Sequence, residues 1–310
     1  MADARTSALQ STAGTGRTAG RFALLRALRV HQWVKNLLLF VPALLDHRLF
    51  DPDAMTRSGA AFAAFCCASS GGYILNDLLD LEADRRHPTK RDRPFASGAL
   101  APALGLALIP ALFGAAVWIG WTLRPSAFLD LLLLYMALTA AYSFALKRLA
   151  VVDVLLLAGL YTLRVIAGVE AAQVRFSTWL LAFSTFLFLS LAFLKRYTEV
   201  RGLEGSADLQ ILRRGYQLGD EQWLSSMGSA SGYLSVLVLA LYINSDQVMA
   251  LYSRPLLLWL VCPLLLYWTS RMWLLAFRGR IHDDPIVATV RDPTSYLVAV
   301  LVALTLYTAL

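Results

Sequence analysis

Long apolar runs recur along nearly the whole chain, and they restrict what it can fold into more than any other feature. A bilayer core needs about 20 apolar residues per helix, with roughly 17–25 tolerated. The pattern predicts an all-α fold, a polytopic membrane helix bundle of about nine transmembrane helices. The first run is the weakest, since Lys35 and Pro42 interrupt it, and the last is short. The predicted spans are about 33–50, 57–78, 101–122, 127–146, 151–171, 177–196, 223–243, 254–275 and 293–310.

Composition agrees with a membrane chain and bounds its domains. Hydrophobic residues make up 58% of the chain and charged residues 16%, whereas a soluble protein is nearer to a quarter charged. The N-terminal residues are small, polar and basic with no apolar core, which predicts a disordered cytosolic tail over residues 1–25 and no cleavable signal. Residues 26–310 are expected to form a single transmembrane domain. The three cysteines lie inside apolar runs and are expected to be buried and reduced.

The placement of the basic residues explains the net charge of +7. If the N-terminus is cytoplasmic, 22 of the 28 Lys and Arg residues fall on the cytoplasmic side, as the positive-inside rule expects. The charge is therefore topological, and nucleic-acid binding is not expected. The two long loops, 79–99 and 197–222, lie on the same side. We therefore expect a multi-pass protein of the plasma (inner) membrane with its site at the cytoplasmic face.

The stretch LNDLLDLEADRRHPTKRDRP, residues 75–94, concentrates charge at the end of the second run. Asn76, Asp80 and Asp84 recur at i, i+4 and i+8, so on one α-helix they share a face, with Asp77 beside them. Mg²⁺ prefers oxygen ligands and is usually bound by one or two carboxylates plus substrate phosphates. The stretch therefore indicates a Mg²⁺–diphosphate site. Phosphate contacts are expected from its basic residues, Arg85, Arg86, Lys90, Arg91 and Arg93.

A second polar group closes the sixth run in FLKRYTEVRGLE, residues 193–204. Lys195 and Glu199 are i, i+4 neighbours, with Arg196 and Tyr197 between them. Alone, this pattern is equally typical of a membrane-interface anchor, where Lys, Arg and Tyr are common. Because it faces the same side as the aspartate-rich stretch, we favour a second half of the same site.

The residues GGYILNDLLDLEADRRHPTKRDRP resemble the first aspartate-rich motif of the UbiA superfamily of intramembrane prenyltransferases. Its pattern N-D-x-x-D-x-x-x-D is met by Asn76, Asp77, Asp80 and Asp84. Nine spans, with long cytoplasmic loops after the second and sixth, also resemble that family. The resemblance extends over nearly the whole chain after residue 25.

The chain departs from the usual family pattern after the sixth run. Aromatic prenyltransferases of the family carry a second motif, D-x-x-x-D, where this chain has Lys195 and Glu199. That substitution is similar to the decaprenyl-phosphate phosphoribosyltransferase branch, as are HQWVKN (31–36), HPTKR (87–91) and KRYTE (195–199). The resemblance implies transfer of 5-phosphoribosyl from phosphoribosyl diphosphate to a polyprenyl (decaprenyl) phosphate, releasing diphosphate. The product would be a precursor of arabinose donors for the cell wall.

The resemblance also implies roles for individual residues. Catalytic roles are expected for Asp77, Asp80, Asp84, Lys195 and Glu199, and Mg²⁺ is expected on Asn76, Asp77, Asp80 and Asp84. The substrate-binding residues are expected to be Lys35, Asn36, Asn76, Arg85, Lys90, Arg91, Arg93, Tyr142, Lys147, Arg164, Arg196 and Tyr197.

Two other functions remain open. An aromatic or other acceptor prenyltransferase would need the same neutralisation of a departing diphosphate, so the first motif does not separate it from phosphoribosyl transfer. A transporter is a weaker alternative, because transporter sites lie near the midplane at repeat interfaces, and here the charged groups gather at one face.

Several residues keep two interpretations. Arg164 lies deep in the fifth run and either pairs structurally with another helix or contacts a substrate. Asp153 is either a site residue or the salt-bridge partner of Lys147 and Arg148. Other acids, Asp220, Glu221, Asp283 and Asp284, are expected to be solvated loop residues. A groove for the polyprenyl chain could be lined by Phe183, Phe186, Phe188 and Phe193, or these side chains could face lipid.

Overall fold

The computed structural model is a bundle of helices, with no strand among the residues it describes. It describes residues 22–86, 90–123, 127–202, 215–217, 219–246, 248, 252–281 and 284–310. The elements in chain order are η1 (Val30–Phe40), α2 (Val41–Leu45), α3 (Pro52–Leu79), α4 (Leu81–Arg86), η2 (Lys90–Asp92), α5 (Pro102–Thr122), α6 (Phe128–Phe144), η3 (Leu146–Arg148), α7 (Val152–Ala172), α8 (Thr178–Arg201), α9 (Glu221–Ile243), η5 (Pro255–Leu260), α11 (Val261–Phe277), α12 (Pro285–Arg291) and α13 (Pro293–Ala309).

The predicted all-α, multi-pass membrane architecture is confirmed. Within the described ranges, six helices are long and apolar enough to cross a bilayer. A seventh results if α12 and α13, which meet at 84°, count as one span. The predicted spans 33–50 and 127–146 correspond to shorter apolar helices, Val30–Leu45 and Phe128–Phe144. The figure of nine spans therefore stays a prediction.

The first predicted span departs most from a regular helix. It begins as the 3₁₀ segment η1 and continues as the short helix α2, in which Pro42 takes a first-turn position, where its missing N–H costs no hydrogen bond. Arg29, just before η1, has a left-handed backbone with φ of 51°. Residues 22–27 are helical, at the point where the predicted tail would meet the bundle. Residues 1–21 lie outside the described ranges.

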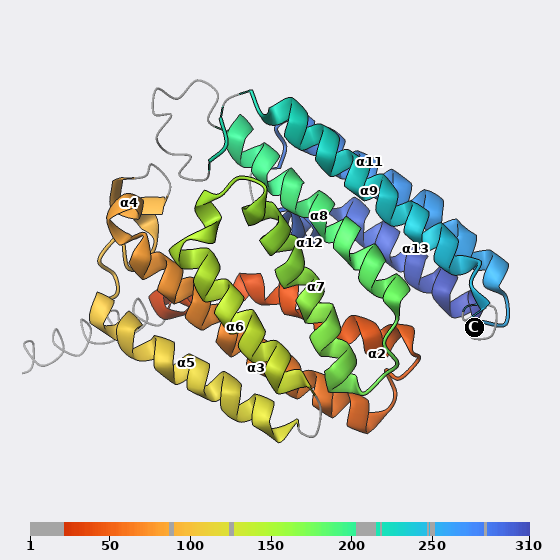
Figure 1. Cartoon of the computed structure of the whole chain (residues 1–310), viewed down its shortest axis with the longest axis horizontal. Coiled ribbons are helices and arrows are strands. Elements are labelled where there is room, and N and C mark those ends of the chain that lie inside the picture. The colour runs from red at the N-terminus through yellow and green to blue at the C-terminus, as the bar shows by residue number, and fades with distance from the viewer. Residues whose placement is uncertain are drawn as a thin grey trace, which may run out of the picture.

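The helices pack closely, and the polar segments lie at one end of the bundle. A Cβ added to Gly71 of α3 would lie 2.6 Å from the ring of Phe113 in α5, and one added to Gly168 of α7 would lie 2.4 Å from the Leu39 carbonyl in η1. Small residues of this kind let helix backbones approach closely in membrane bundles. The ends of α3, α6 and α8 and the start of α7 lie on one side (Figure 1), and α12 contacts both η1 and α8.

Candidate active site

The aspartate-rich stretch spans two helices rather than one. Helix α3 ends at Leu79, Asp80 is its C-cap residue, and α4 begins at Leu81. The i to i−4 hydrogen bonds nevertheless continue across this break. The amide of Asp80 donates to the Asn76 carbonyl at 3.0 Å, and the amide of Asp84 donates to the Asp80 carbonyl at 2.8 Å. The expected stacking along one face is therefore largely kept, although the single continuous helix is not.

One cation, Lys147, joins the first two members of this face. Its Nζ donates to Asn76 Oδ1 at 3.0 Å and to Asp80 Oδ2 at 2.7 Å. Lys147 comes from η3, which follows α6, so a residue distant in sequence completes this part of the site. These contacts place Lys147, a predicted substrate-binding residue, beside Asn76 and Asp80.

Two arginines hold the other two carboxylates. Arg93 Nη1 lies 3.1 Å from Asp77 Oδ1 and 2.6 Å from Asp84 Oδ2. Arg29 Nη2 donates to the same oxygen of Asp77 at 2.5 Å, and the Asp77 side chain is only 2% exposed. Arg29 was not predicted, because it precedes the aspartates by 48 residues. We call the following residues the aspartate cluster: Asn76, Asp77, Asp80 and Asp84 with Arg29, Arg93 and Lys147.

The aspartate cluster has the donor chemistry that a hard cation requires. In the part of the chain that the structure describes, no three His, Cys, Asp or Glu side chains converge as a ligand group. Instead, the oxygens of Asn76 and Asp80 meet at one lysine nitrogen, and those of Asp77 and Asp84 meet at one arginine nitrogen. Each of these two pairs of oxygens thus lies within hydrogen-bonding distance of one cationic side chain. These residues therefore fit Mg²⁺, which uses few carboxylates and completes its shell with phosphates and water.

The basic residues after the aspartates divide by exposure. Lys90 interacts electrostatically with Asp80 and Asp84 of the first predicted motif and with Glu199 of the second. Burial lowers the pKa of its ammonium group, and the nearby Arg93 guanidinium lowers it further. Other basic side chains of this segment, Arg85, Arg86 and Arg91, are exposed. Residues 87–89, the first part of the HPTKR segment, lie outside the described ranges.

The KRYTE segment is organised by a buried arginine. Arg196 is fully buried and donates to Asp153 and Glu199, and to the Tyr142 hydroxyl at 2.8 Å. Asp153 is likewise fully buried and accepts a bond from the Tyr216 hydroxyl at 2.8 Å. Asp153 was considered as the salt-bridge partner of Lys147 and Arg148. That interpretation is wrong for Lys147, because Asp153 pairs with Arg196 and Lys147 pairs with Asp80.

Asp284 is the acid that sequence reasoning assigned incorrectly. Its Oδ2 accepts hydrogen bonds from Lys35 Nζ at 2.7 Å and Lys195 Nζ at 3.0 Å, and its side chain is only 8% exposed. It is therefore not a solvated loop residue, whereas Asp283 lies outside the described ranges. Burial alone would raise the pKa of the Asp284 carboxyl, but the two ammonium groups hold it well below its usual range.

Two further predicted residues bind each other inside the bundle. Arg164 Nε donates to Asn36 Oδ1 at 2.9 Å, and Nη2 donates to the Tyr135 hydroxyl at 2.7 Å. Asn36 is fully buried and Arg164 is 4% exposed. These contacts favour the structural interpretation of Arg164, in which it joins η1 to α6 and α7. Their substrate contacts stay predictions.

Tyr197 faces the C-terminal helices. It is 3% exposed, its hydroxyl accepts a bond from Arg201 at 2.6 Å, and its ring packs against Trp273 of α11. Arg201 in turn lies over the ring of Phe277. The structure thus separates Tyr197 and Arg201 from the Arg196 and Asp153 contacts.

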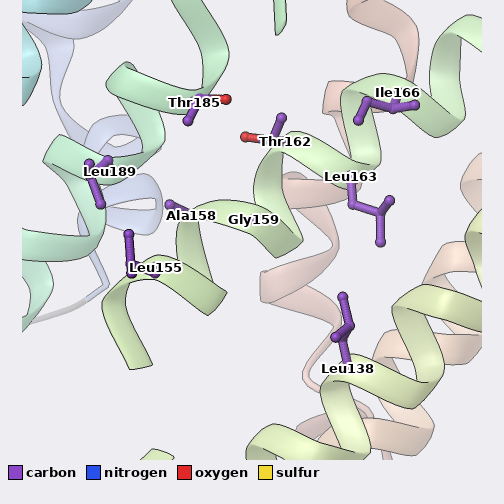
Figure 2. A pocket seen from close by; sticks show the side chains of 9 residues that line it. All are labelled: Leu138, Leu155, Ala158, Gly159, Thr162, Leu163, Ile166, Thr185 and Leu189. Atoms are coloured by element: carbon purple, nitrogen blue, oxygen red, sulfur yellow. The ribbon is translucent and has the colours of Figure 1, made fainter. Parts of the chain in front are cut away.

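A mainly apolar groove lies among α6, α7 and α8 (Figure 2) and has a volume of about 270 Å³. It begins within about one helical turn of the Arg196 contacts, since Leu138 precedes Tyr142 by four residues and Leu155 follows Asp153 by two. The four phenylalanines for which a groove or a lipid-facing position was left open do not line it, and Phe188 is buried in the core. The lining residues are Leu138, Leu155, Ala158, Gly159, Thr162, Leu163, Ile166, Thr185 and Leu189.

Comparison with known sequences gives a consistent result. The sequence profile of the UbiA prenyltransferase family matches residues 39–287. The chain is 40% identical over 282 residues to the uncharacterized protein y4nM of Sinorhizobium fredii, covering 90% of this chain and 54% of that protein. It is 35% identical over 271 residues to the nodulation protein NoeC of Azorhizobium caulinodans, covering 87% of each.

Sequence similarity to proteins of described activity covers a smaller share of the chain. The chain is 37% identical over 182 residues to the decaprenyl-phosphate phosphoribosyltransferase of Mycolicibacterium smegmatis, covering 57% of each protein. The chain thus spans little more than half the length of this relative and of the S. fredii protein. Among solved structures, a UbiA homolog from Archaeoglobus fulgidus bound to GPP and Mg²⁺ has a TM-score of 0.71 at 12% identity, covering 93% of this chain and 99% of that one.

Proposed function

The chain belongs to the UbiA prenyltransferase family, and from this premise we propose that it transfers a 5-phosphoribosyl group from phosphoribosyl diphosphate to a polyprenyl phosphate. It is a multi-pass integral membrane protein and a transferase, so the transporter alternative is set aside. The observation that carries the proposal is the lysine pair, Lys35 and Lys195, which meets at Asp284. Lys195 stands where aromatic prenyltransferases resembling this chain would have a carboxylate.

The proposed donor has two anionic ends, and the site has two regions that contain cationic side chains. The aspartate cluster would receive the diphosphate, and the lysine pair would receive the 5-phosphate. Arg196, also predicted to bind substrate, is less suitable for this role, because its side chain is fully buried and binds both Asp153 and Glu199. The Lys195 side chain is 26% exposed. The lysine pair is therefore the better candidate for the second phosphate.

Mg²⁺ would be held by the oxygens of the aspartate cluster, from Asn76, Asp77, Asp80 and Asp84. When bound, it would neutralise charge on the diphosphate and so favour departure of this group. The presence of Mg²⁺ in the A. fulgidus homolog supports this assignment at the level of the shared fold.

In the proposed reaction, the bond between ribose C1 and the diphosphate oxygen breaks, and the diphosphate leaves with the electron pair. An oxygen of the acceptor phosphate then forms the new bond to C1. Lys90, Arg93 and Lys147 lie where positive charge can stabilise the departing group. The acceptor is already an anion, so the reaction requires no strong general base.

The acceptor's chain would lie in the groove of α6, α7 and α8, which is mainly apolar and is lined largely by α7 and α8, two of the helices long enough to cross a bilayer. Because the donor is water-soluble, the site would face the cytoplasm, with the N-terminus on the same side. The bias of Lys and Arg toward that side supports this orientation.

One alternative within the family keeps specific support. The aspartate cluster would neutralise any departing diphosphate, and the A. fulgidus homolog was solved with GPP. Transfer of a polyprenyl group from its diphosphate to an aromatic or other acceptor therefore remains the second candidate. It leaves the lysine pair without a phosphate to bind.

Replacing Lys195 by Ala separates these candidates. A charge-assisted hydrogen bond contributes about 1.5–3 kcal/mol, so the KM for phosphoribosyl diphosphate should rise about tenfold or more while the KM for polyprenyl phosphate changes little. Arg201→Ala is the matched control. It removes a cation from the same end of α8, where Arg201 donates a hydrogen bond to the Tyr197 hydroxyl. An unchanged donor KM in Lys195→Ala would count against the phosphoribosyl assignment.

A further inference from the structure

Asp284 has no role in the proposed reaction, yet it is the residue on which both lysines converge. We infer that Asp284 is a positioning residue that holds Lys35 and Lys195 together as a binding site for a phosphate monoester, and so selects a donor with a second phosphate. This inference rests on the proposed function and adds a determinant of donor specificity to it.

The geometry requires an anion at this point. Lys35 Nζ and Lys195 Nζ both contact the same oxygen, so the two nitrogens lie within about 6 Å of each other. At this separation two ammonium groups repel, and the attraction of each to the Asp284 carboxylate between them offsets that repulsion. Without the carboxylate, the two flexible side chains would move apart and their spacing would be lost.

Three distant parts of the chain contribute to this arrangement. Lys35 belongs to η1, Lys195 to α8, and Asp284 lies immediately before α12, which packs against both elements. The Lys35 ammonium is also 5.6 Å from the ring centre of Tyr161 in α7. Residues from four elements, η1, α7, α8 and the start of α12, thus hold the two lysine side chains in place.

The pair remains able to bind a ligand. Each ammonium has three N–H donors, and Asp284 takes one from each. Lys195 is 26% exposed, so the site is open on its side. The trio carries one net positive charge, which complements a phosphate monoester of about −1.5 to −2 at neutral pH. An allylic diphosphate has no such second group and would gain nothing from this site.

The test uses the purified full chain in detergent with Mg²⁺ and measures displacement of radiolabelled phosphoribosyl diphosphate at equilibrium. Ribose 5-phosphate probes the lysine pair, and inorganic diphosphate probes the aspartate cluster. For Asp284→Asn, the inhibition constant of ribose 5-phosphate should rise about tenfold or more, since charge-assisted contacts are lost. That of inorganic diphosphate should change less than about twofold.

Asp292→Asn is the matched control. Asp292, like Asp284, precedes a proline and caps a helix, and it pairs with a different cation, Arg271. It should leave both inhibition constants unchanged even if it lowers stability. Lys35→Gln removes the other end of the bridge and should reproduce the selective loss of ribose 5-phosphate binding, which provides the test if Asp284→Asn does not fold.

The possible failures are distinguishable. If the wild-type chain binds neither ribose 5-phosphate nor phosphoribosyl diphosphate, the proposed function and this inference both fall. If the wild type binds both, but Asp284→Asn and Lys35→Gln bind ribose 5-phosphate equally well, the inference alone is overturned. An equal loss for both probes would also overturn it, because a general disturbance of the fold would then explain the result.

Discussion

The buried pair of Asp153 and Arg196 should be essential to stability. Neither side chain is exposed at all, and Arg196 also binds Glu199 and Tyr142. The perturbation is Asp153→Ala, which leaves the guanidinium buried with one fewer anion. Asp153 lies at the start of α7 and Arg196 near the end of α8, so the loss should loosen the junction of these helices.

The expected magnitude follows from the burial. Removing one partner of a buried ion pair costs about 3–5 kcal/mol, because the remaining charge is uncompensated. Since Glu199 stays on the same guanidinium, the lower end, about 3 kcal/mol, applies here. At about 2 °C per kcal/mol for a large chain, the midpoint of thermal unfolding should fall by roughly 6 °C.

The assay is thermal unfolding in detergent, followed by tryptophan fluorescence. Glu82→Ala serves as the control, because Glu82 is an exposed acid. Surface substitutions usually change the free energy of unfolding by less than about 0.5 kcal/mol. The double variant Asp153→Ala, Arg196→Met should be more stable than Asp153→Ala alone, since no buried charge remains unpaired. A loss below about 1 kcal/mol in Asp153→Ala would refute the reasoning.

Three further predictions concern the site. Asp80→Ala and Asp84→Ala should each abolish Mg²⁺-dependent turnover while the protein still purifies as a folded species, and full activity in either would contradict the metal assignment. Gly159→Leu should fill the groove and raise the KM for polyprenyl phosphate about tenfold, because an added Cβ meets no atom there within 4 Å. Gly114→Leu, at another open position, is its control, and an equal effect in both would count against the groove. Because the pKa of Asp284 is held below its usual value, its stabilisation should be complete above about pH 4 and be lost as the pH falls through the lowered pKa. The difference in unfolding midpoint between wild type and Asp284→Asn should thus stay constant from about pH 8 to 5 and shrink only below about pH 4, and a difference that shrinks already near pH 6 would contradict this.

The local parts of the fold and site could be predicted from the sequence. Apolar length alone identifies membrane helices, because a bilayer fixes how many residues a span needs. The spacing of Asn76, Asp80 and Asp84 survives the break at the end of α3, since the backbone hydrogen bonds continue through it. The helical period alone was therefore enough to predict that these three side chains share one face.

The remaining contacts depend on packing between distant segments. Asp284 is 249 residues from Lys35 and 89 from Lys195, so no local pattern connects them. Asp153 has Lys147 as a sequence neighbour, but the packing of α7 on α8 gives it Arg196 instead. Lys35 and Asn36 of η1 likewise have partners that are distant in sequence, Asp284 just before α12 and Arg164 on α7.

The most direct measurement is a turnover assay on the purified chain in detergent with Mg²⁺. One reaction contains radiolabelled phosphoribosyl diphosphate and a polyprenyl phosphate, and a parallel reaction contains a polyprenyl diphosphate and 4-hydroxybenzoate. The account predicts that label enters the lipid phase in the first reaction and that the second gives no product. Product from the second reaction alone would contradict it and would mean that one carboxylate near the end of α8, Glu199, suffices for prenyl transfer.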